Sequence, residues 1–372
     1  MIDNNKKQST HGLLPSQAIK KLIESEQICL AQPLMQGQIQ PASLDLRLGN
    51  IAYRVRASFL PGPGQNVSDK LEDYTLHKID LTASAVLETG CVYVVPLIES
   101  LNLPETISAA ANPKSSTGRL DVFTRVISNG GRSFDQIDAG YSGPLYAEIC
   151  PQTFPILVRT GSRLSQIRFR LGDVGYTDST LFDLQDEHQL VSSDTPDIAN
   201  GIALSVDLMG ENTTGEGLLG YRAKRHTGLI DVDAPGACDI KDYWEPIYGY
   251  NEKRLILDPD EFYILASKEA VHVPPTHAAE MVPFNPLVGE FRVHYAGFFD
   301  PGFGHDSAGG AGSKGVLEVR SHKVPFILED GQIIGRLIYE KLTEMPELVY
   351  GKTISSNYQA QGLKLSKHFR SS

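Results

Sequence analysis

The sequence predicts a mainly β protein made of two fused copies of one β fold, preceded by a short N-terminal helix. Short strand-like stretches separated by glycine and proline run from about residue 28 onward, a pattern typical of barrels and sandwiches. Residues in the two halves match at a constant offset of 170 positions, which indicates an internal repeat. The length of 372 residues is enough for two domains of ordinary size.

The elements follow from local patterns. Residues 1–12 are polar and expected to be loosely ordered. A helix is predicted to open at Leu14-Pro15-Ser16, because proline is tolerated in a first turn, and apolar residues at helical spacing give it one inward face: Ala18, Ile19, Leu22 and Ile23. The predicted strands that follow are, in chain order, SLDLRL, AYRV, CVYVV, LYAEI, QIRFR, EFYIL, FRVHY, LEVR and IGRLIYE.

The repeat defines the expected domains. Positions that match at the offset of 170 include Leu87 with Leu257, Tyr93 with Tyr263, Glu99 with Glu269, Pro104 with Pro274, Glu148 with Glu318 and Gly161 with Gly331. The polar segment 192–197 is the expected join. We therefore expect a first β domain over residues 1–193 and a second, partly degenerate β domain with the C-terminal tail over residues 194–372.

Composition limits the class of function. The net charge is −11, from 34 basic and 45 acidic residues, so a general nucleic-acid partner is disfavoured. A small phosphorylated substrate needs only a local positive pocket. The four cysteines form no Cys-x-x-Cys pair and no zinc spacing. No apolar signal core or membrane-spanning run is present, so we expect a cytoplasmic, reduced protein without a membrane partner.

The stretch from residue 112 to 148 carries the candidate chemistry. Lys114, Ser115, Ser116 and Arg119 place two cations and two hydroxyls within six residues, which suits an anion pocket. The same Ser-Ser-Thr-Gly run is also an ordinary turn sequence. Glu148 alternates with apolar residues on a predicted strand, on its less apolar face. A strand glutamate of this kind is more often a solvated surface residue.

Several motifs, in order along most of the chain, resemble those of the dCTP deaminase family, which is related to the trimeric dUTPases. Residues 114–119 are similar to the family's phosphate loop Arg-Ser-Ser-x-x-x-Arg, and residues 138–143 to its Asp-x-Gly-aromatic-x-Gly turn. Residues 40–49 look like the first-strand signature, and residues 358–362 like the Tyr-Gln-x-Gln-Gly tail. The resemblance implies a dUTPase-like distorted β-barrel or jelly-roll in each copy.

The resemblance also implies a reaction and its residues. It implies hydrolytic deamination of dCTP to dUTP and ammonia without zinc, with Glu148 as the general base that activates water for attack on C4 of cytosine. Ser115 and Arg119 would position that water and stabilise charge. Lys114 and Ser116 would bind the triphosphate, together with a Mg²⁺ ion that bridges its oxygens. No metal ligand from the protein is expected.

Further binding residues are implied by the same resemblance. Tyr358 and Gln361 of the tail would close over the nucleotide, with Lys364 or Lys367 as additional phosphate partners. Asp138 and Tyr141 would lie near the deoxyribose, although their turn is equally a good hairpin corner. Family members are homotrimers with active sites between subunits. A homo-oligomer is therefore expected, with the loop and the glutamate facing each other across subunits or copies.

The sequence departs from the family at two places. Asp135-Gln136 stands where the family has His-Arg, so Gln136 replaces the arginine that supports the base pocket, and recognition of cytosine stays open. The second copy has residues 285–289 in place of the serine-containing loop but keeps Glu318. We expect the first copy to carry the phosphate loop, while the sequence leaves open whether Glu318 works in a site.

Three other functions compete with the leading one. The nearest is a bifunctional deaminase of the same fold that continues to dUMP and pyrophosphate. A plain dUTPase is a third, although its Pro-Arg-Ser-Gly-Leu-Ala loop and glycine-rich tail are not in the sequence. A non-catalytic nucleotide-binding regulatory protein, in which the glutamate is incidental, is the alternative from another class.

Overall fold

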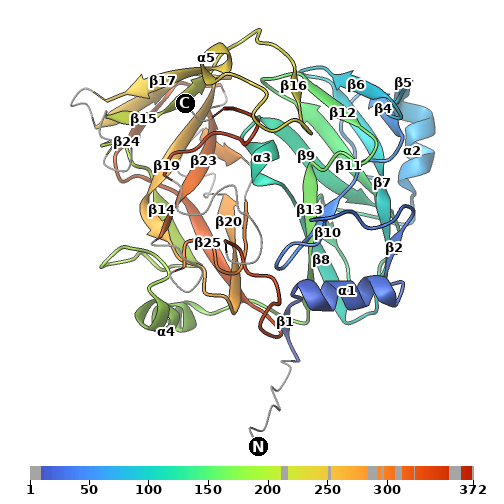
Figure 1. Ribbon diagram of the computed structural model, residues 1–372, viewed down its shortest axis with the longest axis horizontal. Helices are drawn as coiled ribbons and strands as arrows, with labels where there is room; N and C mark the ends of the chain where they lie inside the picture. Colours follow the sequence, from blue (N-terminus) through green and yellow to red (C-terminus); the bar gives the residue numbers. More distant parts are fainter. Residues whose placement is uncertain are drawn as a thin grey trace, which may run out of the picture.

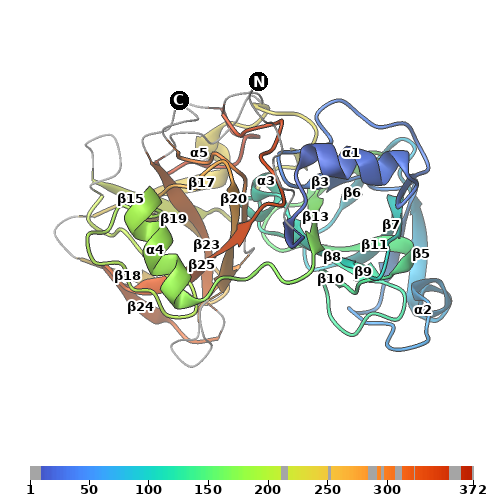
Figure 2. The same ribbon diagram turned by 90° about the horizontal axis from the view of Figure 1, so that it is seen from below.

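The structure, a computed structural model, describes residues 10–210, 217–249, 253–283, 291–294, 297–305, 312–321, 323–351 and 362–370. Two β-rich halves lie side by side in it, the first copy coloured blue to green and the second yellow to red (Figure 1). Seen from below, the chain leaves β13 of the first half and crosses to α4 of the second (Figure 2). The prediction of a mainly β chain with two related copies is confirmed.

The first copy is built from three sheets. One sheet has the order β1-β13-β8-β10, with β3 also paired to β13: Gly12–Leu13, Ser165–Leu171, Ile107–Pro113, Gln136–Ile137 and Leu44–Leu46. The second has the order β5-β4-β7-β11-β9, with β2 paired to β7: Thr75–Asp80, Ile51–Val55, Val92–Asn102, Ser142–Pro151, Val122–Ser128 and Ile28–Leu30. The third pairs β12 with β6, Ile156–Arg159 and Ser84–Leu87, and is extended by β16 of the second copy, Ile230–Asp231, which runs parallel to β12.

The second copy repeats this plan. One sheet has the order β14-β25-β20-β22: Ile202–Ser205, Ile333–Lys341, His277–Pro283 and Phe298–Phe299. Another has the order β17-β15-β19-β23-β21: Trp244–Tyr248, Leu218–Ala223, Phe262–Val271, Ser313–Ser321 and Phe291–His294. The last pairs β18 with β24: Arg254–Leu257 and Phe326–Glu329. Strands β6, β8 and β12 match β18, β20 and β24 at the offset of 170, so the repeat seen in sequence is a repeat of structure.

Helices are short. They are α1 to α5: Ser16–Glu24, Val67–Tyr74, Ser115–Gly118, Asp178–His188 and Ile240–Tyr243. The third of them, α3, lies at the junction between the copies. The predicted helix is confirmed as α1, with Ile19 and Leu22 buried and Lys20 exposed on its outer side. The sequence reasoning did not predict α2 and α4. Among the described residues, none of the helices has both the length and the apolar character needed to cross a membrane.

The join between the copies involves α4. Leu181 of this helix, and Leu190 and Val191 after it, belong to the hydrophobic core of the second copy. Val191 also forms a bridge with Val271 of that copy. Because core membership defines a folding unit better than local polarity does, we propose that the second copy begins near residue 177, ahead of the boundary at 193/194 expected from sequence.

The surface between the copies is rich in buried charge. Arg168 of β13 is fully buried and donates from Nη1 to the carbonyl of Ala279 and from Nη2 to the carbonyl of Phe299, both at 2.9 Å. Its guanidinium also lies 3.4 Å from Asp300 and 3.9 Å from Glu340. One side chain of the first copy thus bonds two carbonyls of the second and lies near two of its carboxylates, which fixes how the copies dock.

Replacing this arginine tests the docking. We expect Arg168→Met to lower the free energy of unfolding by about 3–5 kcal/mol, because truncation leaves buried carboxylates without their cation. Arg222→Met, which removes a half-exposed ion pair with Glu245 inside the second copy, should cost only about 0–1 kcal/mol. Urea denaturation of both variants measures the difference, and equal small effects would show that Arg168 does not fix the interface.

Candidate active site between the copies

The serine-containing loop is a single helical turn, α3, between strands β8 and β9. Lys114 precedes the turn, and its carbonyl accepts hydrogen bonds from the N–H groups of Thr117 and Gly118 at 2.8 and 3.0 Å. The turn ends at Asp121, whose positive φ of 55° redirects the chain into β9. The predicted anion loop therefore has a defined shape, which presents Lys114, Ser115 and Arg119 from one short segment.

Arg119 points to the second copy. Its Nε lies 3.8 Å from Oε1 of Glu318 on β23, and both side chains are nearly fully buried. Its Nη1 donates to the carbonyl of Lys364 at 2.9 Å. The arginine of the first copy's loop and the strand glutamate of the second copy therefore form one site. The distance exceeds that of a hydrogen bond, so the two charges attract each other without being tightly joined.

Burial gives Glu318 unusual acid–base behaviour. Loss of solvent raises the pKa of this carboxyl to about 8, although the nearby Arg119 guanidinium opposes the rise. A carboxylate becomes a stronger base as its pKa rises toward the working pH, which is how enzymes adapt glutamate to general acid–base work. Among strand glutamates, a buried one beside a single arginine is a candidate for such a role.

Glu148, the base implied by the sequence, lies on a strand as predicted but not on an exposed face. It is buried and accepts hydrogen bonds from Nη2 and Nε of Arg125 at 2.5 and 3.2 Å. Arg125 is the cross-strand partner of Glu148 on β9, and its guanidinium lies 4.5 Å from the ring centre of Phe123 and 3.5 Å from that of Phe134. One oxygen of this carboxylate, Oε1, is thus bonded by an arginine of its own copy.

The two glutamates differ in what stands opposite them. Arg125 faces Glu148 in the β9–β11 register, whereas His294 occupies the corresponding register position opposite Glu318 in the second copy. The first copy therefore has an internal cation for its glutamate, and the second copy's glutamate meets the arginine of the other copy's loop.

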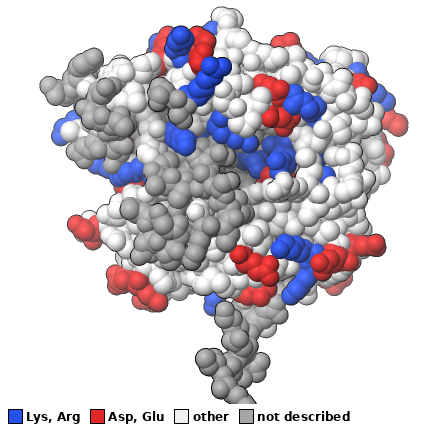
Figure 3. All heavy atoms as spheres, viewed as in Figure 1, with Lys and Arg blue, Asp and Glu red and all other residues white. Residues whose placement is uncertain are grey.

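Basic side chains gather next to the loop. Lys114 forms an ion pair with the buried Asp45, and Arg163 lies 3.4 Å from the same carboxylate. Burial lowers the pKa of Lys367, and the positive charges of Lys114 and Arg163 lower it further, so these cations share one field. Lysine and arginine atoms cluster near the middle of the face in Figure 3, close to where α3 lies in Figure 1. Such a cluster suits a polyphosphate.

The C-terminal segment is attached to the loop. The hydroxyl of Ser366 donates to the carbonyl of Ser116 at 2.8 Å, and His368 bonds Ser366 and the carbonyl of Val232 at 2.9 and 2.8 Å. With the bond from Arg119 to Lys364, these contacts anchor the segment that follows the tail motif. Tyr358 and Gln361, the predicted tail ligands, lie outside the described residues.

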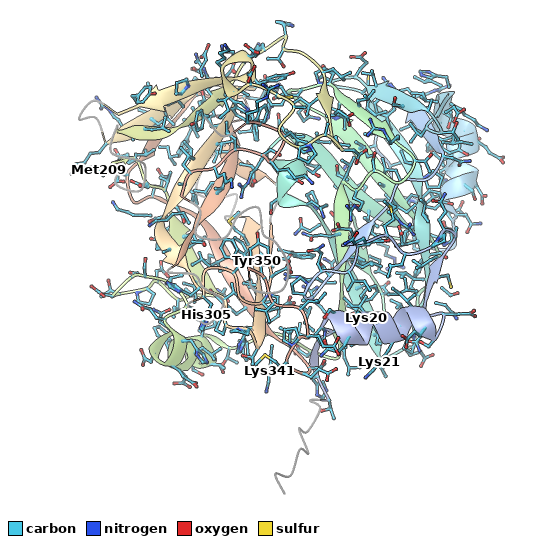
Figure 4. The ribbon with its side chains drawn as sticks, in the orientation of Figure 1. Lys20, Lys21, Met209, His305, Lys341 and Tyr350 are labelled. Carbon is cyan, nitrogen blue, oxygen red and sulfur yellow. The ribbon has the colours of Figure 1, made fainter. Side chains whose placement is uncertain are left out.

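The two Asp-x-Gly-aromatic turns differ in surroundings. In the first copy, Asp138 is exposed and the Tyr141 hydroxyl donates to the carbonyl of Pro144 at 2.6 Å, as expected for a hairpin corner. In the second copy, burial raises the pKa of Asp300, while Arg168 and, more weakly, Lys114 lower it. The second copy's turn is therefore the one that lies toward the first copy's loop. Tyr350, labelled in Figure 4, packs on Phe303 of this turn with ring centres 5.8 Å apart.

The structure thus joins only part of the predicted set. Lys114, Ser115, Ser116 and Arg119 share one loop. From the second copy, Glu318 meets Arg119, and Asp300 lies within the electrostatic reach of Lys114. Glu148, Asp138 and Tyr141 contact residues of the first copy instead. The offset of 170 marked Glu318 as the equivalent of Glu148, and the shared Asp-x-Gly-aromatic pattern, with a difference in loop length, marked Asp300 as the equivalent of Asp138. Only spatial contact shows which member of each pair faces the loop.

The pKa of Glu318 predicts a pH effect on stability. Because the folded-state pKa of about 8 lies above the unfolded value of 4.5, the native state holds a proton that the unfolded state has lost, and stability falls as the pH rises between these values. Glu318→Gln removes this loss. In thermal melts from pH 5 to 9, the melting temperature of Glu318→Gln relative to that of the original chain should rise with pH. A difference that stays constant would contradict the raised pKa.

Comparison with known proteins agrees with this architecture. A sequence description of the N-terminal domain of 2′-deoxycytidine 5′-triphosphate deaminase matches residues 10–173, and one of the C-terminal domain of the same enzyme matches residues 177–369. The chain is also similar to the crystal structure of 2′-deoxycytidine 5′-triphosphate deaminase from Agrobacterium tumefaciens. That similarity has a TM-score of 0.86 and 60% identity, and covers 91% of this chain and all of the other.

Shorter relatives match part of the chain. A Sulfurihydrogenibium protein named "dCTP deaminase, dUMP-forming" is 30% identical over 160 residues, 42% of this chain and 82% of its own. A Haloarcula marismortui protein named "dCTP deaminase" is 29% identical over 134 residues, 36% of this chain and 66% of its own. Several further relatives carry the dUMP-forming name. The chain belongs to the 2′-deoxycytidine 5′-triphosphate deaminase family.

Proposed function

We propose that this chain hydrolytically deaminates dCTP at a site that its two copies form together, with Glu318 as the general base. The observation that carries this proposal is the buried approach of Arg119 to Glu318 across the copies, at 3.8 Å. The sequence alone favoured Glu148 for this role. The bond from Arg125 to Glu148 and the position of the loop favour Glu318 instead.

The proposed chemistry uses one carboxylate twice. Ionised Glu318 takes a proton from water, the resulting hydroxide attacks C4 of cytosine, and the proton passes to the amino group that leaves as ammonia. A carboxyl with a pKa of about 8 both accepts and returns a proton near neutral pH. Hydrolysis at C4 consumes one water and releases one ammonia, so no external oxidant or reductant is required.

The first copy's loop supplies the stabilising groups. Arg119 is cationic and close to Glu318, so it favours the negative charge that builds up as water is deprotonated and the tetrahedral intermediate forms. Ser115, partly exposed at the start of α3, is placed to hold the attacking water. For the turn residue nearest the deoxyribose, we propose Asp300 of the second copy in place of Asp138 of the first.

The triphosphate would occupy the basic cluster. Lys114, with Arg163 and Lys367 around Asp45, provides positive charge beside the loop, and Ser116 contributes to its shape. Among the described residues, no group of three His, Cys, Asp or Glu side chains is arranged to hold a metal ion. We therefore propose that Mg²⁺ arrives on the triphosphate oxygens as part of the substrate, where it offsets their charge.

The product is a separate question. The leading expectation from sequence was release of dUTP, with continuation to dUMP and diphosphate as the alternative. The names of several relatives favour the alternative for this chain, namely dUMP formation. Hydrolysis of the phosphoanhydride requires a second water at the α-phosphorus, within the same basic cluster.

The compartment and the assembly are further parts of the proposal. All four cysteines are free thiols, which agrees with the reducing cytoplasm that we propose. One chain provides both the loop and Glu318, so the site needs no second chain for these groups. A larger homo-oligomer of such chains stays a prediction.

Two glutamine variants test which carboxylate reacts. Glu318→Gln should lower kcat with dCTP by about 10²–10⁴-fold, because it removes the general base. Glu148→Gln, the matched substitution at the equivalent position, should retain activity within about tenfold, as expected for a group outside the reacting centre. Ammonia release measures both, and the opposite ranking would return the role to Glu148. No ammonia release from the original chain, with nucleotide binding retained, would favour a non-catalytic nucleotide-binding protein.

Product analysis tests the second hydrolysis. The chain is incubated with dCTP and Mg²⁺, and nucleotides are separated by ion exchange. We expect dUMP and diphosphate in step with ammonia. Accumulation of dUTP would identify a deaminase that stops after the first reaction, and cleavage of added dUTP without change in dCTP would identify a dUTPase.

A further inference from the structure

A second ion pair crosses the copies beside the proposed site. Two residues beyond Glu318 on β23, Arg320 forms an ion pair with Asp121, which lies two residues beyond Arg119. The same guanidinium donates to the hydroxyl of Thr153 at 2.8 Å, and that hydroxyl donates to Asp121. The Asp121 side chain is 1% exposed and that of Arg320 is 13% exposed. The pair is therefore almost removed from solvent.

The spacing links this ion pair to the reacting groups. Residues two apart on a strand point to the same face, so Glu318 and Arg320 both project from β23 toward the first copy. Asp121 ends the α3 turn with a positive φ of 55° and leads directly into β9. A contact that fixes Asp121 against β23 therefore also fixes the segment that carries Arg119.

We propose that Arg320 and Asp121 act as a clamp between the copies that sets the distance between Arg119 and Glu318. Arg320 is a positioning residue and does not touch the substrate. The proposal rests on the function proposed for Glu318, and it assigns to the site a residue outside the predicted motifs.

The order of charges allows only one alignment of the loop along β23. Across the junction, Arg119 faces Glu318 and Asp121 faces Arg320. A slip of the loop along β23 by two residues would bring Arg119 toward Arg320 and leave Asp121 without its cation. Like charges in a buried contact are strongly unfavourable, so only one register satisfies both pairs. The clamp thus opposes the displacement that would separate the base from its arginine.

The surroundings of Arg320 allow this residue to be replaced without unfolding the protein. Arg320 and Thr153 line a cavity of about 480 Å³ between the copies, together with Gln152, Arg225, Asp260 and Phe262. Water in this cavity can reach Asp121 when the guanidinium is removed. Trp244, the only tryptophan of the chain, packs between Phe154 of the first copy and Phe262 of the second, with ring centres 5.4 and 6.0 Å away. Its fluorescence therefore reports whether the junction stays intact.

Kinetics of three variants test the clamp. With dCTP, Arg320→Met should lower kcat by about 10- to 100-fold, as expected for misplacement of a catalytic group, with KM changed by no more than about threefold. The acidic limb of the kcat–pH profile should move to higher pH, because a more distant Arg119 no longer lowers the pKa of Glu318. Arg320→Lys should recover part of kcat. Asp121→Asn combined with Arg320→Met should be no slower than Arg320→Met alone.

The matched control is Arg222→Met, which removes an ion pair within the second copy and should change neither kcat nor the profile. The clamp is overturned if Arg320→Met keeps kcat and the profile of the original chain. It is also overturned if kcat falls only together with a red shift of Trp244 emission, which would indicate a disrupted junction. If the original chain does not turn over dCTP, the proposed function fails separately.

In that case the clamp is judged without substrate. The pH dependence of stability, compared with and without Glu318→Gln, gives the pKa of Glu318. The clamp predicts a higher pKa in the Arg320→Met background than in the original chain, and an unchanged pKa overturns it.

Discussion

The arrangement of this molecule depends on charged groups that are buried where the copies meet. Arg168 reaches Asp300 and Glu340, and Arg170 bonds Glu280 and Glu340 at 3.1 and 2.7 Å. Removing such groups from water is costly unless every one finds its partner. Apolar packing alone would tolerate several ways of docking two β sandwiches, but paired charges tolerate few. The strand that carries Glu318 meets the first copy through two further ion pairs, Arg119 with Glu318 and Asp121 with Arg320, so the geometry of the site also depends on how the copies dock.

The duplication has separated the parts of the site. The first copy keeps the loop with Lys114 and Arg119, and the second keeps a glutamate without an arginine opposite it on the neighbouring strand. In the first copy, Arg125 occupies that opposite position and bonds Glu148. The carboxylate of Glu148 is therefore engaged by an arginine of its own copy. The two copies therefore differ in complementary ways, and the loop of the first meets the glutamate of the second at the junction.

Local sequence patterns explain why much of the fold was predictable. Strands such as 145–149 and the helix beginning near Ser16 follow from periodicity, and the repeat follows from matching residues in equivalent strands. The pairing of Arg119 with Glu318 was not accessible, because it joins residues about 200 positions apart through docking of two folded units. The alternation around Glu148 also did not show that both faces of its strand are buried, since a strand covered by a second layer buries both faces. The polar α4 lacked a strong apolar periodicity, so it was missed.

The electrostatics of the site present a conflict that the basic cluster resolves. Burial raises the pKa of Glu318 to about 8, which makes it a strong base that is mostly protonated at neutral pH. A bound triphosphate would raise that pKa further, because its negative charges disfavour a nearby carboxylate. Lys114, Arg163 and Lys367 lie where they would offset those charges. Arg119 adds a local positive charge on the side of the carboxylate itself. In the proposed site, the cations would thus serve binding and base strength together, since they would hold the phosphates and favour ionisation of Glu318.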